Sequence, residues 1–153
     1  PVLVLPMLTL HVPTSLGCRR SMPPLCRLVP VPSGGVVLWG KGYDSREAAS
    51  LSWLRGVPTD YSGDIDTHGF AILNRARAHL PQVRSVLMDR QTLLVHRDRW
   101  GSEPTPTSAA LDLLDDAEAA LYADLVTDRY GPSVRLEQER IDWGWAMERL
   151  GLA

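Results

Sequence analysis

The sequence predicts an α/β domain with a mostly parallel sheet flanked by helices, and three observations support this class. From residue 36 onward, short apolar runs alternate with longer amphipathic stretches. Gly, Pro and Asp residues typical of turns separate the two kinds of segment. The chain has 153 residues, of which 44% are apolar and 22% charged, and this composition suits one domain with a buried core.

Residues 1–32 differ from the rest and are predicted to form an irregular segment that precedes an α/β domain of residues 33–153. The segment holds 7 of the 12 prolines, and neither Asp nor Glu occurs before Asp44. Proline removes backbone donors and interrupts helices and sheets, so only residues 2–5 are expected to form a strand. The arginines of the segment indicate either a small nucleic-acid-binding arm or a solvated, aberrant stretch, and the second interpretation is favoured.

The first strand of the α/β domain is predicted over residues 36–39, an apolar run bounded by glycines. The Gly40-Lys41-Gly42 turn that follows offers backbone N–H groups and a lysine, which suit either a bound phosphate or a plain glycine turn. It lacks the spacing of a P-loop. Asp44 or Ser45 then caps a predicted helix over residues 44–54.

A strand over residues 59–63 is predicted to lead through an acidic turn into a helix over residues 69–80. Asp64 and Asp66 lie two positions apart, so in extended backbone both side chains leave on one face. Asp66 or Thr67 can cap the helix. Two carboxylates at the carboxyl end of a strand offer hard oxygen ligands to a divalent cation. The same pattern also occurs in ordinary surface turns, and two close carboxylates repel unless a positive group joins them.

The next elements continue the alternation of strands and helices. Residues 83–88 are predicted to form a third core strand. Asp89 then caps a helix over residues 92–99, in which His96 is expected at the surface or at its boundary. Right-handed crossovers between these parallel strands would bring the Gly40–Gly42 turn and the acidic turn to one edge of the sheet.

The C-terminal third is predicted to hold two more helices. Asp115 or Asp116 begins the first of them, over residues 117–128, and Gly131 follows it. The side chains expected to face inward are Leu121, Leu125 and Val126 in that helix, and the final helix holds Trp143, Trp145, Met147 and Leu150.

Residues 134–141 alternate ambiguously between a short strand and the start of a helix. Glu137 and Glu139 in this stretch offer a second set of carboxylates. They equally suit a charged face that pairs with Arg135 and Arg140, which is the interpretation that the residues alone favour.

Composition limits the classes of function. A formal net charge of −2 excludes a global basic field, so contact with DNA would need a local patch or a partner. Cys18 and Cys26 have neither zinc-site spacing nor a disulfide framework and are interpreted as free thiols. No transmembrane run or signal peptide is recognised, so a cytoplasmic protein is expected. Because Pro1 opens the chain, we expect a fragment, a processed product or part of a longer open reading frame.

Three motifs occur in a specific order along the chain. They are Val-Val-Leu-Trp-Gly-Lys-Gly-Tyr at residues 36–43, Gly-Asp-Ile-Asp-Thr-His-Gly-Phe-Ala-Ile-Leu at residues 63–73 and Arg-Leu-Glu-Gln-Glu-Arg-Ile at residues 135–141. Together they resemble the C-terminal domain of the JetD family, the nuclease subunits of Wadjet anti-plasmid systems. That domain is a Toprim domain, similar to that of the topoisomerase VI A subunit. The resemblance covers about residues 34–142 and implies a Toprim-like fold.

The resemblance implies a site that hydrolyses DNA phosphodiesters with Mg²⁺ or Mn²⁺. Asp64 and Asp66 match the metal-binding pair, and Glu137 and Glu139 match a late acidic motif, either member of which would face the metal. Lys41 is expected to contact a phosphate as a point charge. The implied partners are double-stranded circular DNA, a condensin-like motor complex that delivers it, and a second copy of the full-length protein, with no membrane.

One feature departs from the family pattern. Toprim domains carry a Glu directly after their first strand, as a metal ligand or general acid/base, whereas Pro6-Met7 follows the strand expected at residues 2–5. We therefore hypothesise that residues 6–32 are a frameshifted or mis-joined reading, which translation of the other two frames would test.

Two classes of function remain open as a result. One is an active metal-dependent endonuclease. The other is a catalytically inactive Toprim remnant that acts as a DNA-binding or dimerisation module. A topoisomerase is least favoured, because it would need a nucleophilic Tyr on a separate winged-helix domain.

Overall fold

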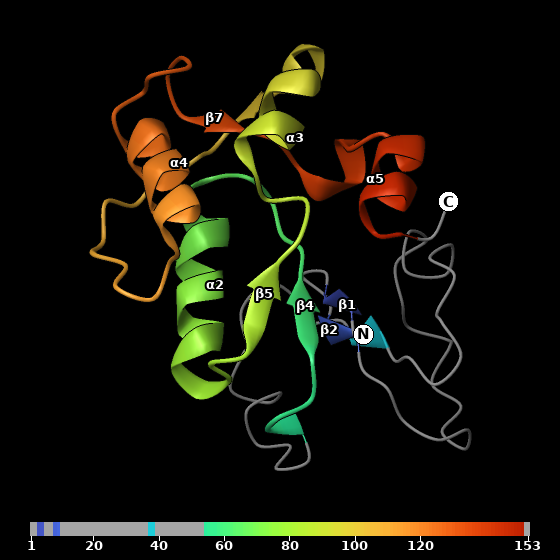
Figure 1. The fold of residues 1–153 in the computed structure, drawn as a ribbon. Helices are drawn as coiled ribbons and strands as arrows, with labels where there is room; N and C mark the ends of the chain where they lie inside the picture. Colours follow the sequence, from blue (N-terminus) through green and yellow to red (C-terminus); the bar gives the residue numbers. More distant parts are fainter. Residues whose placement is uncertain (1–2, 5–7, 10–36, 39–53, 152–153) are drawn as a thin grey trace.

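A small parallel sheet lies at the centre of the chain (Figure 1). The computed structural model describes residues 3–4, 8–9, 37–38 and 54–151. In the sheet, β4 (Thr59–Tyr61) lies between β1 (Leu3–Val4) and β5 (Val83–Ser85), and both pairings are parallel. Helices accompany the sheet, so the architecture agrees with the predicted α/β class. The strand expected at residues 2–5 is confirmed as β1.

A second, antiparallel pair joins β2 (Leu8–Thr9) to β3 (Val37–Leu38). It corrects one prediction, because the strand predicted at residues 36–39 is present at residues 37–38 but pairs with β2 and not with the parallel sheet. Leu8–Thr9 forms a strand within the segment predicted to be irregular, and the rest of residues 6–32 lies outside the described residues. An apolar run predicts that a strand forms but does not determine its partner, which is why the pairing was missed. The helix predicted over residues 44–54 lies almost wholly outside the described residues.

Helix α2 (Thr67–His79) follows β4 and begins at the acidic turn. Asp66, one of the two predicted caps, caps it by accepting a hydrogen bond from the Gly69 N–H at 2.7 Å. A Cβ atom at Gly69 would lie 2.0 Å from the backbone oxygen of Asp64. Only glycine therefore allows the first turn of α2 to pack this closely on the strand end.

Helix α4 (Asp116–Val126) lies beside α2 (Figure 1). Asp115 caps it in a capping box with Glu118, which confirms one of the two caps predicted. Leu125 is buried, but Val126, predicted to face inward, is 36% exposed. Adjacent helical residues point about 100° apart, so Leu125 and Val126 do not both face the core.

The remaining elements surround the carboxyl edge of the sheet. The strands β6 and β7 pair antiparallel, with Gly101 opposite Arg135. The ambiguous stretch at residues 134–141 contains both a strand and a short helix. The elements are α3 (Arg90–Val95), η3 (Arg97–Arg99), β6 (Gly101–Ser102), β7 (Val134–Arg135), η4 (Gln138–Arg140) and α5 (Trp143–Arg149), where η denotes a 3-10 turn.

The expectation for His96 was wrong, because its side chain is buried. Its Nδ1 lies 2.8 Å from the Thr92 carbonyl oxygen, and the Asp142 N–H donates to Nε2 at 2.8 Å. Nε2 therefore accepts, which places the proton of the neutral ring on Nδ1. The Trp145 ring contacts it edge-on at 6.0 Å between centroids. Contacts from the C-terminal segment 46 residues away bury this histidine, and local spacing does not reveal them.

One apolar core extends from the parallel sheet to α2, α3, α4 and β7. Within the part of the chain that the structure describes, no helix combines the length and apolar composition needed to cross a bilayer. The buried side chains of the core are Leu54, Tyr61, Ile65, Phe70, Leu73, Leu80, Val83, Met88, Leu93, Leu121, Leu125, Val134 and Leu136.

Candidate functional site

The acidic turn pairs with the segment that follows β7. The Ile65 N–H donates to the Leu136 carbonyl at 2.9 Å, and the Leu136 N–H donates back to the Ile65 carbonyl at 3.1 Å. Both side chains are fully buried in the core. Because side chains alternate along extended backbone, the residues on either side of Ile65 and Leu136 share the opposite face. Two segments about 70 residues apart thus present their polar side chains together.

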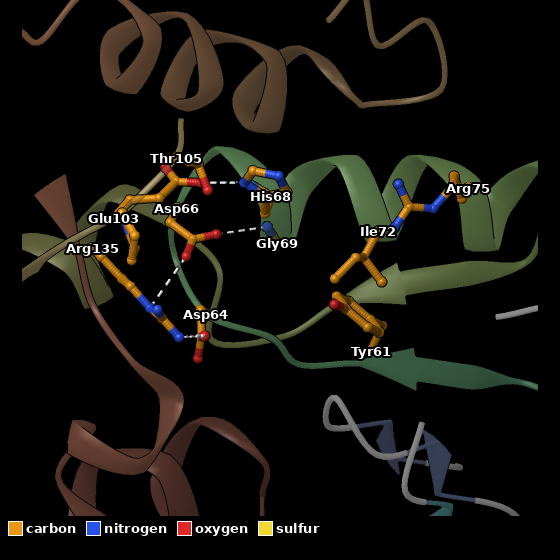
Figure 2. A pocket seen from close by; sticks show the side chains of 11 residues that line it. Tyr61, Asp64, Asp66, His68, Gly69, Ile72, Arg75, Glu103, Thr105 and Arg135 are labelled. Atoms are coloured by element: carbon orange, nitrogen blue, oxygen red, sulfur yellow. Dashed lines mark hydrogen bonds and ion pairs between the residues drawn. The ribbon is translucent and has the colours of Figure 1, made fainter. Parts of the chain in front are cut away.

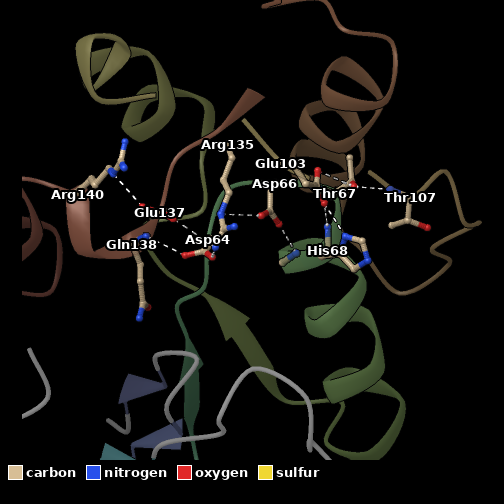
Figure 3. A network of polar contacts seen from close by, with 11 residues as sticks. Asp64, Asp66, Thr67, His68, Glu103, Thr107, Arg135, Glu137, Gln138 and Arg140 are labelled. Atoms are coloured by element: carbon tan, nitrogen blue, oxygen red, sulfur yellow. Dashed lines mark hydrogen bonds and ion pairs between the residues drawn. The ribbon is translucent and has the colours of Figure 1, made fainter. Parts of the chain in front are cut away.

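Arg135 lies between the two aspartates on that face (Figure 3). Its Nη2 is 2.6 Å from Asp64 Oδ2, and its Nε is 3.3 Å from Asp66 Oδ2. The second contact is an ion pair without hydrogen-bond geometry. Arg135 is therefore the positive group that two close carboxylates require.

Each aspartate uses its other oxygen on a backbone donor. The Gln138 N–H donates to Asp64 Oδ1 at 2.9 Å, and the Gly69 N–H donates to Asp66 Oδ1 at 2.7 Å. These bonds fix both carboxylates and turn their remaining oxygens toward the guanidinium of Arg135. The turn thus presents two oxygens to a single cationic position.

Negative charge exceeds positive charge around Asp66. Burial, together with the negative charges of Glu103 and Asp64, raises the pKa of Asp66 to about 6, against the opposing effects of the Gly69 N–H and Arg135. Burial likewise raises the pKa of Tyr61, whose ring lies beside the same carboxylates. Too little positive charge surrounds the buried Asp66 carboxylate to balance its negative charge. Such a site favours the binding of an additional cation.

Glu103 was missed by the sequence reasoning. It follows β6, is only 3% exposed, and accepts hydrogen bonds from the backbone N–H groups of Thr67 and His68 at 3.0 and 3.1 Å. The partners of Glu103 lie 35 and 36 residues away, so no local spacing pointed to it.

A cavity of about 280 Å³ opens beside these groups (Figure 2). It extends from the acidic turn along the first turns of α2 and to the loop after β6. Its lining combines acidic and basic side chains, so it suits a ligand that carries both negative charge and a cation. The polar side chains that line it are Tyr61, Asp64, Asp66, His68, Arg75, Glu103, Thr105 and Arg135.

The later acidic residues occupy different places. Glu137 Oε2 lies 2.8 Å from Arg140 Nε, and Glu137 Oε1 lies 3.7 Å from Arg135 Nη2, at the edge of the aspartate pair. Glu139 is exposed and accepts a hydrogen bond from the Gln138 side chain at 3.1 Å. Glu137 is thus the late glutamate that the fold brings to Arg135. Lys41 lies outside the described residues.

The carboxylates of the acidic turn fit one kind of divalent-metal site. Among the described residues, no three His, Cys, Asp or Glu side chains are arranged to hold a metal ion between them. Mg²⁺, however, is commonly held by one or two carboxylates, with waters and substrate phosphates completing its octahedron. The two converging oxygens of Asp64 and Asp66 fit that kind of site and not an all-protein cage.

The fold and the site together define an α/β domain with an acidic edge where its central strand meets a helix. Residues 25–150 match the family model described as Wadjet protein JetD, C-terminal. Because this match covers most of the chain, the protein belongs to that family. The matched range extends beyond residues 34–142, the range of the three motifs, at both ends. No match was found among curated proteins.

Proposed function

We propose that this chain is a Toprim-like DNA endonuclease domain of a Wadjet-type anti-plasmid system, which uses Mg²⁺ or Mn²⁺ to hydrolyse phosphodiesters of circular DNA. Membership of the JetD C-terminal family supports a Wadjet-related role. The convergence of Asp64 and Asp66 on one cationic position carries the chemical part of the proposal. It is the arrangement that a metal shared with a DNA phosphate would use.

The residues of the turn would hold the cation without rearrangement of the backbone. Asp64 and Asp66 would bind it with the oxygens that now face Arg135, while the N–H groups of Gln138 and Gly69 keep both carboxylates in place. When bound, the divalent ion would polarise a phosphoryl oxygen and lower the pKa of an attacking water.

Arg135 competes with a metal for the same oxygens. Its guanidinium is planar and always charged, so once displaced from Asp64 it is suited to bind a phosphate oxygen of the substrate. Arg135 would then exchange a carboxylate partner for a DNA partner within the same cavity. Glu137, already 3.7 Å from Arg135, would stay available to pair with it or to join the metal site with one oxygen.

Contact with DNA through this chain alone is expected to be weak, because its net charge is −2. Arg75 and Arg135 line the cavity, and Lys41 is a further phosphate contact predicted from the sequence. We therefore propose that a condensin-like motor complex delivers circular DNA to a homodimer of the full-length protein, in the cytoplasm. Because the net charge of this chain gives it little affinity for DNA, delivery by the partner would bring the DNA to the site.

Plasmid cleavage by the purified chain tests the proposal. Supercoiled plasmid would be incubated with Mg²⁺ or Mn²⁺, with and without the motor complex, and nicked and linear products would be measured. Wild type should cleave, and Asp64→Asn or Asp66→Asn should lower the rate by roughly 10²–10⁴-fold, as removal of a central catalytic group does. Asp98→Asn is the matched control, since the Asp98 side chain is 79% exposed.

The second candidate is a catalytically inactive Toprim remnant that binds DNA or dimerises. The absence of any acidic residue before Asp44 favours it, because no carboxylate lies directly after β1, where Toprim domains carry a Glu. Wild type that fails to cleave with the motor complex present, yet binds DNA or forms dimers, would establish this alternative.

A further inference from the structure

Glu103 and His68 form a carboxylate–imidazole pair at the start of α2. His68 Nδ1 lies 2.6 Å from Glu103 Oε1, as drawn in Figures 2 and 3. Of the two side chains, Glu103 is 2% exposed and His68 is 45% exposed. The carboxylate is thus fixed inside the protein, whereas the imidazole reaches the cavity that the two aspartates line.

The hydrogen bonds around this pair determine where its protons lie. The Thr107 N–H donates to Thr67 Oγ1 at 2.7 Å, so the Thr67 hydroxyl uses its own hydrogen on Glu103 at 2.8 Å. Two backbone N–H groups at the positive end of a 13-residue helix also donate to Glu103. A carboxyl surrounded by donors in this way is an ionised acceptor. His68 Nδ1 therefore carries a proton and donates it to Glu103, which leaves Nε2 as the second ring nitrogen.

The other acidic side chains near the cavity already have cationic or backbone partners. Asp64 and Asp66 each bind a backbone N–H and face Arg135, and Glu137 pairs with Arg140. Glu103 itself is enclosed by its four donor groups. Hydrolysis of a phosphodiester also requires a group that takes the proton of the attacking water. Of the side chains described here, the His68 ring offers a nitrogen that none of these contacts uses.

The cavity has a second feature that suits a polar ligand. The Tyr61 hydroxyl is buried, lines the same cavity and has no hydrogen-bond partner among the described residues. A buried hydroxyl is rarely left without a partner unless water or a ligand supplies one. The other charged side chains that line this cavity with His68 are Asp64, Asp66, Arg75, Glu103 and Arg135.

We propose that His68 is the general base of the hydrolysis and that Glu103 is its positioning residue. This inference rests on the function proposed above. The water O–H bond breaks and its proton moves to His68 Nε2, while the water oxygen bonds to phosphorus and the ester P–O bond breaks. The leaving alkoxide takes a proton from solvent, and His68 later returns its proton to solvent. Glu103 holds the Nδ1 tautomer and stabilises the imidazolium that forms, as a carboxylate does in a catalytic triad.

A purely structural role of the His68–Glu103 pair would require a different property of the side chain at residue 68. If the pair only fastened the loop after β6 to α2, a donor at the Nδ1 position would suffice. His68→Asn keeps such a donor near Glu103 and lacks Nε2. His79, an exposed histidine in the last turn of the same helix, provides the matched control His79→Asn.

The first experiment is single-turnover cleavage of plasmid by the full chain with the motor complex and saturating Mn²⁺. His68→Asn should cleave roughly 10²–10⁴-fold more slowly, with an unchanged KM and unchanged Mn²⁺ affinity by calorimetry. Added imidazole should restore part of the rate of His68→Ala, which repair of a structural contact would not do. His79→Asn should match wild type.

A second readout does not depend on activity. In ¹⁵N NMR of the metal-free chain, the neutral His68 ring should show its proton on Nδ1, and Glu103→Gln should reduce that tautomer. Cleavage by His68→Asn at the wild-type rate, or a raised KM with an unchanged kcat, would overturn the role of His68 while the proposed nuclease function stands. Wild type that does not cleave would overturn both. If His68→Asn fails to fold, His68→Gln replaces it in the same assay.

Discussion

Arg135 Nη2 lies 2.6 Å from Asp64 Oδ2, although 71 residues separate the two positions. This contact joins the acidic turn after β4 to the last residue of β7. It also places a permanent positive charge where the oxygens of Asp64 and Asp66 converge. Arg135 thus supplies positive charge at the position where the proposed metal would bind.

Replacement of Arg135 should have opposite effects on stability and on metal affinity. Arg135→Gln leaves two close carboxylates without their cation, so the metal-free chain should lose about 2 kcal/mol, between the values typical of exposed and buried ion pairs. The same variant should bind Mn²⁺ more tightly, because the competing guanidinium is gone. Chemical denaturation and calorimetry measure the two effects. Arg129→Gln, which removes an exposed partner of Asp124, is the control; equal Mn²⁺ affinity in wild type and Arg135→Gln would contradict the competition.

The raised pKa of Asp66 predicts a pH-dependent stability of the metal-free chain. The folded chain has this pKa at about 6, above its ordinary value of 3.8, so between these values the folded state binds more protons than the unfolded state. Stability should therefore fall as pH rises from about 4 to 6, by up to roughly 3 kcal/mol, and then level off. Asp66→Asn, which retains a capping side chain, should remove this part of the pH dependence. Chemical denaturation in the presence of a chelator measures the free energy of unfolding at each pH. The same dependence on pH in wild type and in Asp66→Asn would contradict the raised pKa of Asp66.

Glu118 should make the stability of the folded chain depend on pH in the opposite direction, and in a lower pH range. Burial alone would raise its pKa, but hydrogen bonds from Arg77, from Ser85 and from the Asp115 N–H lower it below 4.5. The stability that this carboxylate contributes is thus fully present above pH 4.5 and is lost as pH falls through its folded pKa.

The pair of Glu118 and Arg77 joins α4 to α2, so its loss should weaken the packing of both helices. Glu118→Gln should cost roughly 2–3 kcal/mol at pH 7, and less as the pH is lowered toward 3. Glu148→Gln, at an exposed position on α5, is the control and should stay near wild type. If Glu118→Gln loses as much stability at pH 3 as at pH 7, the loss comes from the changed shape of the side chain and not from its charge. Thermal unfolding at several pH values provides the measurement.

Gly69 tests how tightly the acidic turn is packed. Gly69→Ala would place a Cβ atom 2.0 Å from the Asp64 backbone oxygen, so either α2 or the turn must move. We expect a loss of roughly 3 kcal/mol and weaker metal binding, because Asp64 shifts with its backbone. Gly101→Ala is the matched control, since its Cβ would meet its nearest atoms at 3.6 and 3.9 Å. A Gly69→Ala chain of wild-type stability would contradict the close approach.

Local signals in the sequence predicted much of the fold. The cap at Asp89 was predicted outright, and those at Asp66 and Asp115 were each one of two adjacent candidates. A side-chain hydrogen bond to the helix is present at all three. The two-residue spacing of Asp64 and Asp66 predicted that both side chains share a face, and both meet Arg135 there. Such features depend on neighbours within three or four residues.

Apart from Val126, whose exposure follows from the helical period, the errors and omissions involve distant contacts. Glu103 reaches α2 across 35 residues, and the burial of His96 depends on Asp142, 46 residues away. The pairing of Ile65 with Leu136, which organises the whole site, has no counterpart in the local pattern of either segment. Arg135 was considered only as a surface partner for the late glutamates, because nothing in its own segment points to the acidic turn.

The most direct measurement is a calorimetric titration of Mn²⁺ and Mg²⁺ into wild type and into an Asp64→Asn/Asp66→Asn double variant. Asp98→Asn would again serve as the control for an exposed carboxylate. We predict that wild type and Asp98→Asn bind the metals and that the double variant does not, since both converging oxygens are then amides. Equal binding by wild type and the double variant, or no binding by either, would contradict the assignment of the acidic turn as the metal site.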